Sequence, residues 1–229
     1  TAENVARKYQ VTRADQQELA VKSHQKAAAA QAAGKFKDEI VAIKAKDGSV
    51  EQDGCIRPDT TQETLSGLAP AFDADGTVTA GTASPLTDGA AAVLVCTEDY
   101  AKRNKLPVLA RLKSIAVAGC APEIMGMGPV PAAQKALKRA GLAIKDIDII
   151  EINEAFASQA IACMRELGID EKKANLDGGG IALGHPLGAT GARITGKAAS
   201  LLAREGKRYA LATQCIGGGQ GIATILERG

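Results

Sequence analysis

The sequence has little aromatic character and almost no excess of charge. It contains no Trp, three Phe and three Tyr in 229 residues, and its 28 Lys and Arg against 26 Asp and Glu leave a formal net charge of +2. Proteins that hold single-stranded nucleic acid combine basic grooves with aromatic stacking platforms, and this composition favours neither. These scarcities argue against a nucleic acid as the partner.

Cysteine and histidine are too few and too scattered for a disulfide framework or a metal site. The five cysteines are odd in number and lack Cys-x-x-Cys spacing, so a reducing compartment fits best. His24 and His185 do not readily supply the ligands of a metal hydrolase. No apolar run reaches the roughly 18 residues of a membrane span, and the start at Thr1 lacks a signal sequence. Because the chain begins with Thr instead of Met, we expect upstream residues to be missing.

Local signals in the N-terminal part predict one long helix. Thr12 can cap a helix that continues through an alanine-rich run to Ala33, and Gly34 can stop it. His24 lies within this helix among Lys and Gln, and we interpret it as a solvated surface residue. Beyond the helix the pattern predicts the short or broken elements of a loop-rich cap: a strand over 40–43, a turn at Asp47-Gly48 and a break over 57–61.

The middle of the chain predicts a return to regular structure. Small apolar residues over 89–97 are typical of a buried strand preceded by a helical turn. A helix over 98–105 follows, and Pro107 then breaks the pattern, which favours a domain boundary near Leu106.

From Val108 onward, predicted strands and helices alternate. This order indicates a layered α/β sheet covered by helices on both faces, in which loops at the carboxyl ends of strands carry the chemistry. Asn153 and Cys215 both lie at such ends. The predicted strands cover 108–118, 147–152, 209–215 and 221–226, and the predicted helices cover 131–140, 154–167 and 187–205.

Two glycine-rich segments in this half carry reactive side chains. In the first, over 177–196, His185 stands between Gly184 and Pro186. Because Pro suits the first turn of a helix, we predict that His185 projects from a helix start, where the dipole favours a developing oxyanion. In the second, an apolar strand delivers Cys215 onto a run of glycines. A thiol near a histidine can be a nucleophile or an acid/base group, whereas a buried Cys among apolar neighbours is usually inert.

Thiolases, the acyl-CoA C-acyltransferases, have C-terminal signatures that resemble three segments of this chain in order and spacing. The segments are Asn153-Glu-Ala-Phe-Ala, Gly184-His-Pro-Leu-Gly-Ala-Thr-Gly-Ala-Arg193 and Cys215-Ile-Gly-Gly-Gly. The similarity extends upstream through Thr77-Val-Thr-Ala-Gly-Thr-Ala-Ser84 and Asp88-Gly-Ala-Ala, so it covers effectively the whole chain. It implies a thiolase-like layered α/β fold with three parts: a partial CoA-binding loop domain over 1–86, a returning segment of the N-terminal domain over 87–106 and the C-terminal domain over 107–229.

The resemblance also implies a reaction. A thiolase of fatty acid metabolism (β-oxidation) cleaves 3-ketoacyl-CoA with CoA to acetyl-CoA and a shortened acyl-CoA, or runs the reverse Claisen condensation. Cys215 resembles the cysteine that moves the α-carbon proton, and the backbone N–H of Gly217 resembles half of an oxyanion hole. His185 resembles the histidine that activates the nucleophilic cysteine and donates to a thioester oxygen. Asn153 resembles the residue that holds a water at that oxyanion site, and an N-cap of the following helix is the alternative.

By the same resemblance, CoA is a substrate and no cofactor is tightly bound. The residues that fall where thiolases contact CoA or its pantetheine arm are Arg57, Phe72, Ala80, Ser84 and Phe156. Without the resemblance, a surface salt bridge would be the simplest interpretation of Arg57, and core packing that of Phe72. The segment 122–131 resembles an interdomain or active-site loop, with Met125 near the acyl group.

The resemblance leaves the nucleophile unassigned. In thiolases it is a second cysteine in an N-terminal domain, whereas we interpret Cys55, Cys96, Cys120 and Cys163 as core or loop residues. We therefore expect a C-terminal portion of a thiolase that lacks most of the N-terminal half. A non-catalytic module for CoA binding or subunit interaction is the alternative. We further expect a homo-oligomer, dimeric or tetrameric when intact, in a bacterial cytoplasm, with a peroxisome or mitochondrion as the alternative compartment.

Overall fold

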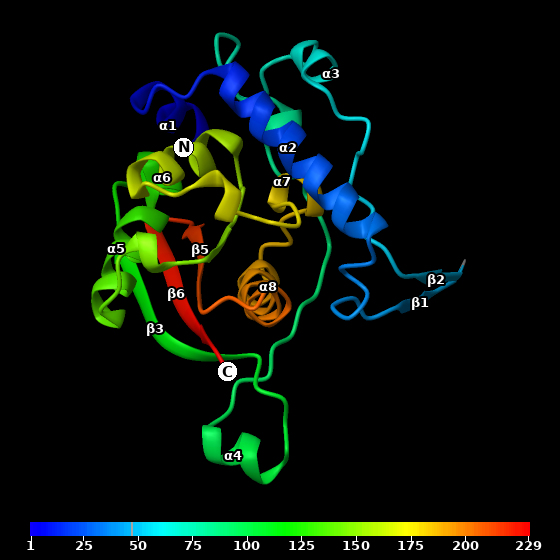
Figure 1. Cartoon of the computed structure of the whole chain (residues 1–229). Helices are drawn as coiled ribbons and strands as arrows, with labels where there is room; N and C mark the ends of the chain where they lie inside the picture. Colours follow the sequence, from blue (N-terminus) through cyan, green and yellow to red (C-terminus); the bar gives the residue numbers. More distant parts are fainter. Residues whose placement is uncertain (47) are drawn as a thin grey trace.

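A four-stranded mixed sheet forms the centre of the protein. The computed structural model describes residues 1–46 and 48–229 (Figure 1). The strand order is β3-β6-β5-β4, in which β4 runs parallel to β5 and the other neighbours are antiparallel. The strands are β3 (Ala110–Gly119), β4 (Ile149–Ile152), β5 (Tyr209–Ile216) and β6 (Gln220–Arg228), so the four strands predicted from Val108 onward are confirmed.

Helices cover both faces of this sheet, as the alternating pattern predicts. α5 (Pro129–Ala140) and α6 (Ala157–Leu167) share one core with Ile150, Leu211 and Ile225. α8 (Thr190–Arg204) shares the other core with Ile149 and Leu226. Successive side chains of a strand point to opposite faces, so the central strands, which are covered on both sides, are mostly apolar. Each fully buried aliphatic side chain stabilises the fold by about 1.5–3 kcal/mol.

The N-terminal part is organised by α2 (Arg13–Ala32), which lies on the same side of the molecule as α6 and α7 (Gly180–Leu183) (Figure 1). Thr12 forms the predicted cap, because its hydroxyl accepts the backbone N–H of Asp15 at 3.1 Å and the Asp15 carboxylate accepts the backbone N–H of Thr12 at 2.9 Å. Gly34 has a φ of +69° just beyond the helix, where glycine is favoured. The predicted long helix is confirmed.

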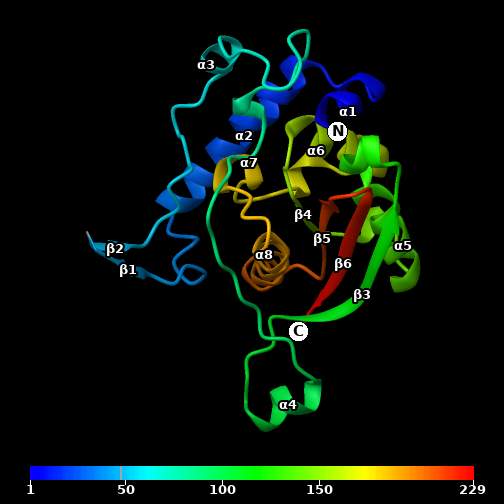
Figure 2. The ribbon, with the colours of Figure 1, turned by 180° about the vertical axis from the view of Figure 1, so that it is seen from behind.

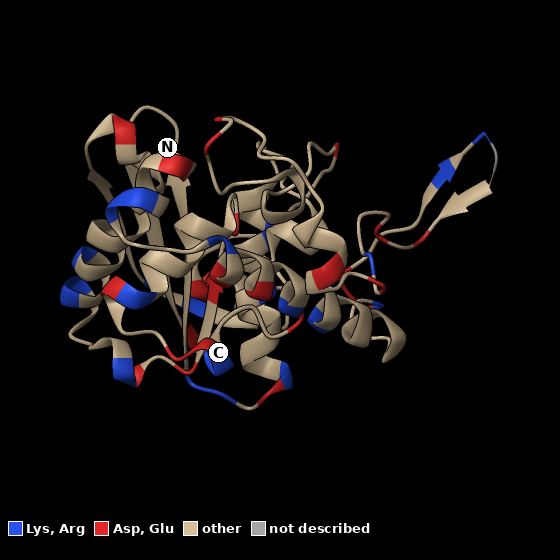
Figure 3. Cartoon of the chain, turned by 90° about the horizontal axis from the view of Figure 1, so that it is seen from above, with Lys and Arg blue, Asp and Glu red and all other residues tan. Residues whose placement is uncertain are grey.

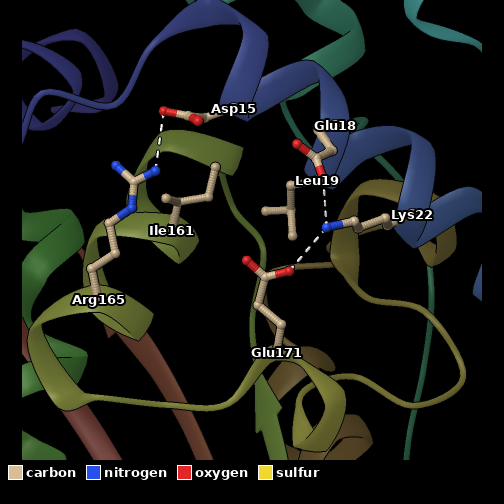
Figure 4. Close-up of a pocket in the computed structure, with 7 residues that line it drawn as sticks. All are labelled: Asp15, Glu18, Leu19, Lys22, Ile161, Arg165 and Glu171. Atoms are coloured by element: carbon tan, nitrogen blue, oxygen red, sulfur yellow. Dashed lines mark hydrogen bonds and ion pairs between the residues drawn. The ribbon is translucent and has the colours of Figure 1, made fainter.

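Ion pairs cross a small cavity between α2 and the C-terminal half (Figure 4). Arg165 of α6 lies 3.1 Å from the Asp15 carboxylate, and Lys22 lies 3.0 Å from that of Glu171. Exposed pairs of this kind contribute only about 0–1 kcal/mol each. Apolar packing also holds α2, since its own Ala20 and Ala27 are fully buried.

The remaining elements are short. They are α1 (Ala2–Lys8), β1 (Ile43–Ala45), β2 (Gly48–Val50), α3 (Gln62–Ser66), α4 (Glu98–Arg103), and the 3-10 turns η1 (Ala80–Thr82), η2 (Pro122–Met127), η3 (Ile144–Asp146) and η4 (Glu171–Lys173). The strand predicted over 40–43 is wrong, because strand pairing starts only where Ile43 meets Val50 in the β1-β2 hairpin. The turn predicted at Asp47-Gly48 includes Asp47, which lies outside the described residues. No helix among the described residues is long and apolar enough to cross a membrane.

The predicted buried strand over 89–97 is also wrong. This segment has no regular structure and runs beside α8, as Figures 1 and 2 show. Leu94 and Val95 are 76% and 79% exposed. A strand needs a neighbour for its backbone N–H and C=O groups, and no strand of the described residues pairs with this one.

The β1-β2 hairpin projects from the rest of the protein, on which basic and acidic side chains are interspersed (Figure 3).

Candidate active site

The parallel pair β4-β5 brings Asn153 and Cys215 to one edge of the sheet. Asn153 directly follows β4, and its backbone N–H donates to the Thr213 carbonyl of β5 at 3.0 Å. Cys215 stands two residues farther along β5, just before the turn at Gly217 that leads into β6. Carboxyl ends of parallel strands are where α/β sheets carry their sites, and the prediction that both residues obey this rule is confirmed.

The side chain of Asn153 is fully buried, and neither of its amide atoms has a hydrogen-bond partner among the described residues. Helix α6 begins only at Ala157 and its N-cap is Phe156, so the interpretation of Asn153 as the helix cap is wrong. The reason is that residues 153–156 are not helical, and Phe156, with extended backbone, pairs with Ala83. An unpaired buried amide costs about 1–3 kcal/mol, so the position fits a group that holds a bound water or ligand.

Glu154 links this sheet edge to α2 and α7, a role that its sequence context did not predict. Its buried carboxylate accepts hydrogen bonds from the Ser23 hydroxyl of α2 at 2.7 Å and from the Asn175 amide at 2.7 Å. It also accepts the backbone N–H of Ile181, in the first turn of α7, at 3.2 Å. The only signal in the sequence was its place next to Asn153. Through these bonds Glu154 fixes α7, which leads directly to the candidate histidine.

His185 lies in the connection between α7 and α8. Gly184 has a φ of +92°, and a Cβ at this position would meet the Thr87 side chain, so glycine is required here. The prediction that His185 sits at the start of the following helix is wrong by one turn, because α8 begins at Thr190. The Pro186 carbonyl accepts the backbone N–H of both Ala189 and Thr190, at 2.8 and 3.0 Å, and this tighter turn precedes the regular helix.

The environment of His185 keeps its ring neutral. Nδ1 lies 2.7 Å from the Thr190 hydroxyl, which in turn donates to the Pro186 carbonyl at 3.1 Å. Burial, reinforced by the charge of Arg193, lowers the pKa of His185 below its ordinary value. A neutral imidazole has one unprotonated nitrogen and can accept a proton at neutral pH.

The first turn of α8 packs against β5 beside Cys215. A Cβ at Gly191 would lie 3.2 Å from the Nε2 atom of Gln214, so the helix that carries Thr190 touches the strand that carries the thiol. His185, bonded to Thr190, and Cys215 therefore belong to the same end of the sheet. Burial raises the pKa of Cys215 to about 11, so its thiol keeps its proton at neutral pH and can donate it.

The 3-10 turn η2 closes the other side of the Cys215 loop. The Cys120 backbone N–H donates to the Gly219 carbonyl at 2.8 Å, and a Cβ at Gly219 would meet Pro122 at 3.2 Å. Met125 belongs to this turn, and its place near the acyl group stays a prediction. Cys163 lies in the core, with its thiol 3.3 Å from the Gly126 carbonyl, and burial raises its pKa.

The residues predicted to contact CoA fall into two groups. The Ser84 backbone N–H and hydroxyl both donate to the Ala155 carbonyl, at 3.0 and 3.1 Å, which places Ser84 next to the Asn153 segment. The rings of Phe72 and Phe156 meet edge to face with 5.9 Å between centroids. Phe72 is 66% exposed, so core packing does not explain it. Ala80 is the first residue of η1 and lies four positions before Ser84 on the same segment.

Arg57 lies elsewhere, against α2. Its backbone N–H donates to Nδ1 of His24 at 3.1 Å. The interpretation of His24 as a solvated residue is wrong: the side chain is 6% exposed, because the segment around Arg57 folds back over this helix face. Burial, together with the charge of Arg57, lowers the pKa of His24. Helical position alone did not reveal this cover, since the covering segment comes 33 residues later.

Comparisons with known proteins agree with this geometry. Residues 1–99 match the family model of the thiolase N-terminal domain, and residues 106–228 match that of the thiolase C-terminal domain. A 3-ketoacyl-CoA thiolase of Vibrio parahaemolyticus is 53% identical over 237 aligned residues, covering 100% of this chain and 61% of the relative. A 3-ketoacyl-CoA thiolase of Shewanella loihica is equally similar, at 53% identity and the same coverage. The chain thus spans about 61% of the length of these curated relatives.

Solved structures share the fold. Human mitochondrial 3-ketoacyl-CoA thiolase in complex with CoA superposes with a TM-score of 0.94 at 47% identity, covering 100% of this chain and 58% of that one. Acetyl-CoA acetyltransferase of Bacillus anthracis gives a TM-score of 0.95 at 45% identity, covering 99% of this chain and 59% of that one. The predicted thiolase-like α/β fold is confirmed, and the chain belongs to the thiolase family.

Proposed function

We propose that the protein is an acyltransferase that cleaves 3-ketoacyl-CoA with CoA, or runs the reverse Claisen condensation, and that this chain supplies the groups that handle the α-carbon. Thiolysis breaks the bond between the α and β carbons, so the departing acetyl-CoA carbanion must receive a proton. Cys215 donates it from Sγ and recovers it in the condensing direction. The thiol suits the acid role because its raised pKa, about 11, keeps it protonated until the carbanion develops.

His185 and Asn153 stabilise the negative charge that develops on the thioester oxygen. His185 takes the proton of an attacking thiol at Nε2 and then, as imidazolium, donates to the thioester oxygen. Asn153 holds a water that donates to the same oxygen, and the Gly217 backbone N–H contributes to a second oxyanion site. These roles leave the acyl-accepting nucleophile outside the assigned residues. The observation that carries the proposal is the fully buried Asn153 amide, whose two polar atoms find no hydrogen-bond partner in the described part of the chain, at the sheet edge that also bears Cys215.

CoA is the substrate that this arrangement suits, with no tightly bound cofactor. We propose that the pantetheine arm runs past Ser84, Ala80 and the ring pair of Phe72 and Phe156, and that Arg57 binds the phosphate end. The exposed face of Phe72 is an apolar surface that such an arm can cover. We also propose the division of the chain into a loop-domain part over 1–86, a returning segment over 87–106 and a C-terminal domain over 107–229. Self-association into a dimer or tetramer belongs to the same proposal.

Thiolysis of acetoacetyl-CoA by CoA, followed in the full-length protein, tests the reaction. Cys215→Ala is expected to lower kcat by roughly 10²- to 10⁴-fold, the share that a placed proton-transfer group contributes. Cys163→Ala is the matched control, because it removes a thiol that lies in the core and not at the sheet edge. Turnover in Cys215→Ala equal to that of the wild type would refute the assignment.

A non-catalytic CoA-binding or subunit-interaction module is the alternative, and the unassigned nucleophile favours it. Exchange of the acetyl-CoA methyl protons in D₂O separates the two functions, because it needs the acid/base thiol and no acyl transfer. The catalytic proposal expects exchange that Cys215→Ala abolishes and Cys163→Ala preserves. A module would bind CoA in calorimetry and give no exchange with this 229-residue chain.

A further inference from the structure

Thr190 is fully buried at the first position of α8, and its hydroxyl makes two hydrogen bonds. The oxygen lies 2.7 Å from Nδ1 of His185 and 3.1 Å from the Pro186 carbonyl, to which it donates. A hydroxyl carries a single hydrogen, so once that hydrogen is donated to Pro186 the oxygen can only accept from the ring. The arrangement therefore requires the proton of a neutral His185 to be on Nδ1.

A second arrangement competes with this one. The Pro186 carbonyl already accepts the backbone N–H groups of Ala189 and Thr190, so the hydroxyl hydrogen is free to turn toward Nδ1 instead. The two arrangements differ when the ring gains a proton. An oxygen that accepts Nδ1–H keeps its bond in both the neutral and the protonated ring, whereas a hydroxyl that donates to Nδ1 loses its bond on protonation. A ring that exchanges protons at Nε2 is held in place throughout only by the first arrangement.

We propose that Thr190 is a positioning residue whose hydroxyl accepts the Nδ1–H of His185 and thereby presents the unprotonated Nε2 to the site. The catalytic part of this inference rests on the proposed function, while the tautomer itself does not. Placement in the fold agrees with it, because the turn that carries Thr190 packs against β5 at Gln214, at the end of the strand that also bears Cys215. The helix start fixes both the tautomer of the ring and its position relative to the sheet edge.

The other histidine of the chain supplies an internal control. His24 is buried, and its Nδ1 accepts the backbone N–H of Arg57 at 3.1 Å, so its proton must be on Nε2 when the ring is neutral. The chain has two histidines, and the structure thus assigns them opposite tautomers. One spectrum of the wild-type protein reports on both rings.

Long-range ¹H–¹⁵N correlation spectra of the ¹⁵N-labelled chain, recorded where both rings are neutral, test the assignment. We expect a protonated Nδ1 in His185 and a protonated Nε2 in His24. In Thr190→Val, which keeps the shape and removes the hydroxyl, His185 is expected to shift toward the Nε2–H tautomer while His24 stays unchanged. Thr190→Ser is expected to restore the wild-type pattern. A wild-type His185 with its proton on Nε2 would overturn the inference whatever the activity.

Kinetics provide the second readout. In the full-length protein, Thr190→Val is expected to lower kcat of thiolysis about 10- to 100-fold. The loss is smaller than the roughly 10⁴-fold cost of a histidine fixed in the wrong tautomer in a serine protease, because the ring in the variant still adopts the Nδ1–H tautomer part of the time. KM should change little, and Thr190→Ser should recover most of kcat. An unchanged kcat beside a shifted tautomer would overturn the positioning role. A protein without thiolysis would instead refute the proposed function and leave the tautomer result standing.

Discussion

Glu151 has its carboxyl group buried away from water, and this makes the free energy of unfolding depend on pH. Its side chain is 1% exposed on β4, and its Oε1 atom has no hydrogen-bond partner among the described residues. Burial raises its pKa from 4.5 to about 8. The charges of Arg193 and Lys197 oppose this rise, and the carboxylates of Asp177 and Glu154 add to it. Glu151 is therefore a neutral acid in the folded protein at neutral pH.

The sign of the effect on stability follows from proton counts. Between pH 4.5 and about 8 the folded protein keeps the Glu151 proton and the unfolded chain releases it. The unfolded state then binds fewer protons, so the free energy of unfolding falls as the pH rises. The fall is about 1.4 kcal/mol per pH unit within this window. From about pH 6 to about pH 8 the loss due to this group is about 2 kcal/mol, because the slope weakens near the folded-state pKa.

Glu151→Gln removes the titration and keeps the shape of the side chain. The free energy of unfolding is measured by denaturant titration across this range for the variant and the wild type. The difference between them should change by about 2 kcal/mol in favour of the variant from about pH 6 to about pH 8. Glu63→Gln, at an exposed position of α3, is the matched control and should run parallel to the wild type. Parallel curves for Glu151→Gln and the wild type would refute the buried neutral acid.

Three further predictions concern stability. Gly221→Ala should destabilise the protein by about 3 kcal/mol or more, because a Cβ there would collide with the Gly128 backbone, whereas Gly217→Ala has open space and should cost less than about 1 kcal/mol in the same denaturant titration. Thr12→Ala should cost about 1 kcal/mol by removing the cap of α2, with Thr12→Ser unchanged, and a null effect would contradict the capping box. Because burial lowers the pKa of His24, stability should fall as the pH drops below about 6.5, and His24→Gln should flatten that fall in urea titrations at several pH values.

Local sequence determined the elements whose signals lie within a few neighbouring residues. The helix cap at Thr12, the stop at Gly34 and the apolar strands around Ile150 and Leu211 all appear where the pattern predicts them. The reason is that helix caps and strand periodicity depend on contacts between close neighbours. The rule that carboxyl strand ends carry chemistry pointed to Asn153 and Cys215 one by one, and the parallel pairing of β4 with β5 then puts them at a shared edge.

Tertiary structure alone decided the features that depend on distant partners. His24 is buried because the Arg57 segment folds over it, whereas the apolar run at Leu94 stays exposed and pairs with no strand of the described residues. Asn153 leaves the helix cap because Phe156 pairs with Ala83 instead. Burial and hydrogen-bond satisfaction are set by what packs against a residue, and a side chain's own neighbours in the sequence do not encode that partner.

The same distinction between local and distant contacts applies to the reactive groups. Residue types and spacing identified a histidine, a thiol and an amide as the reactive groups of a thiolase-family chain. Only the folded chain shows His185 against the Thr190 hydroxyl, the Cys215 thiol with a pKa raised by burial, and an Asn153 amide that no described residue bonds. Protonation and solvation depend on the surrounding atoms, and those atoms come together only when α8, β4 and β5 meet at one end of the sheet.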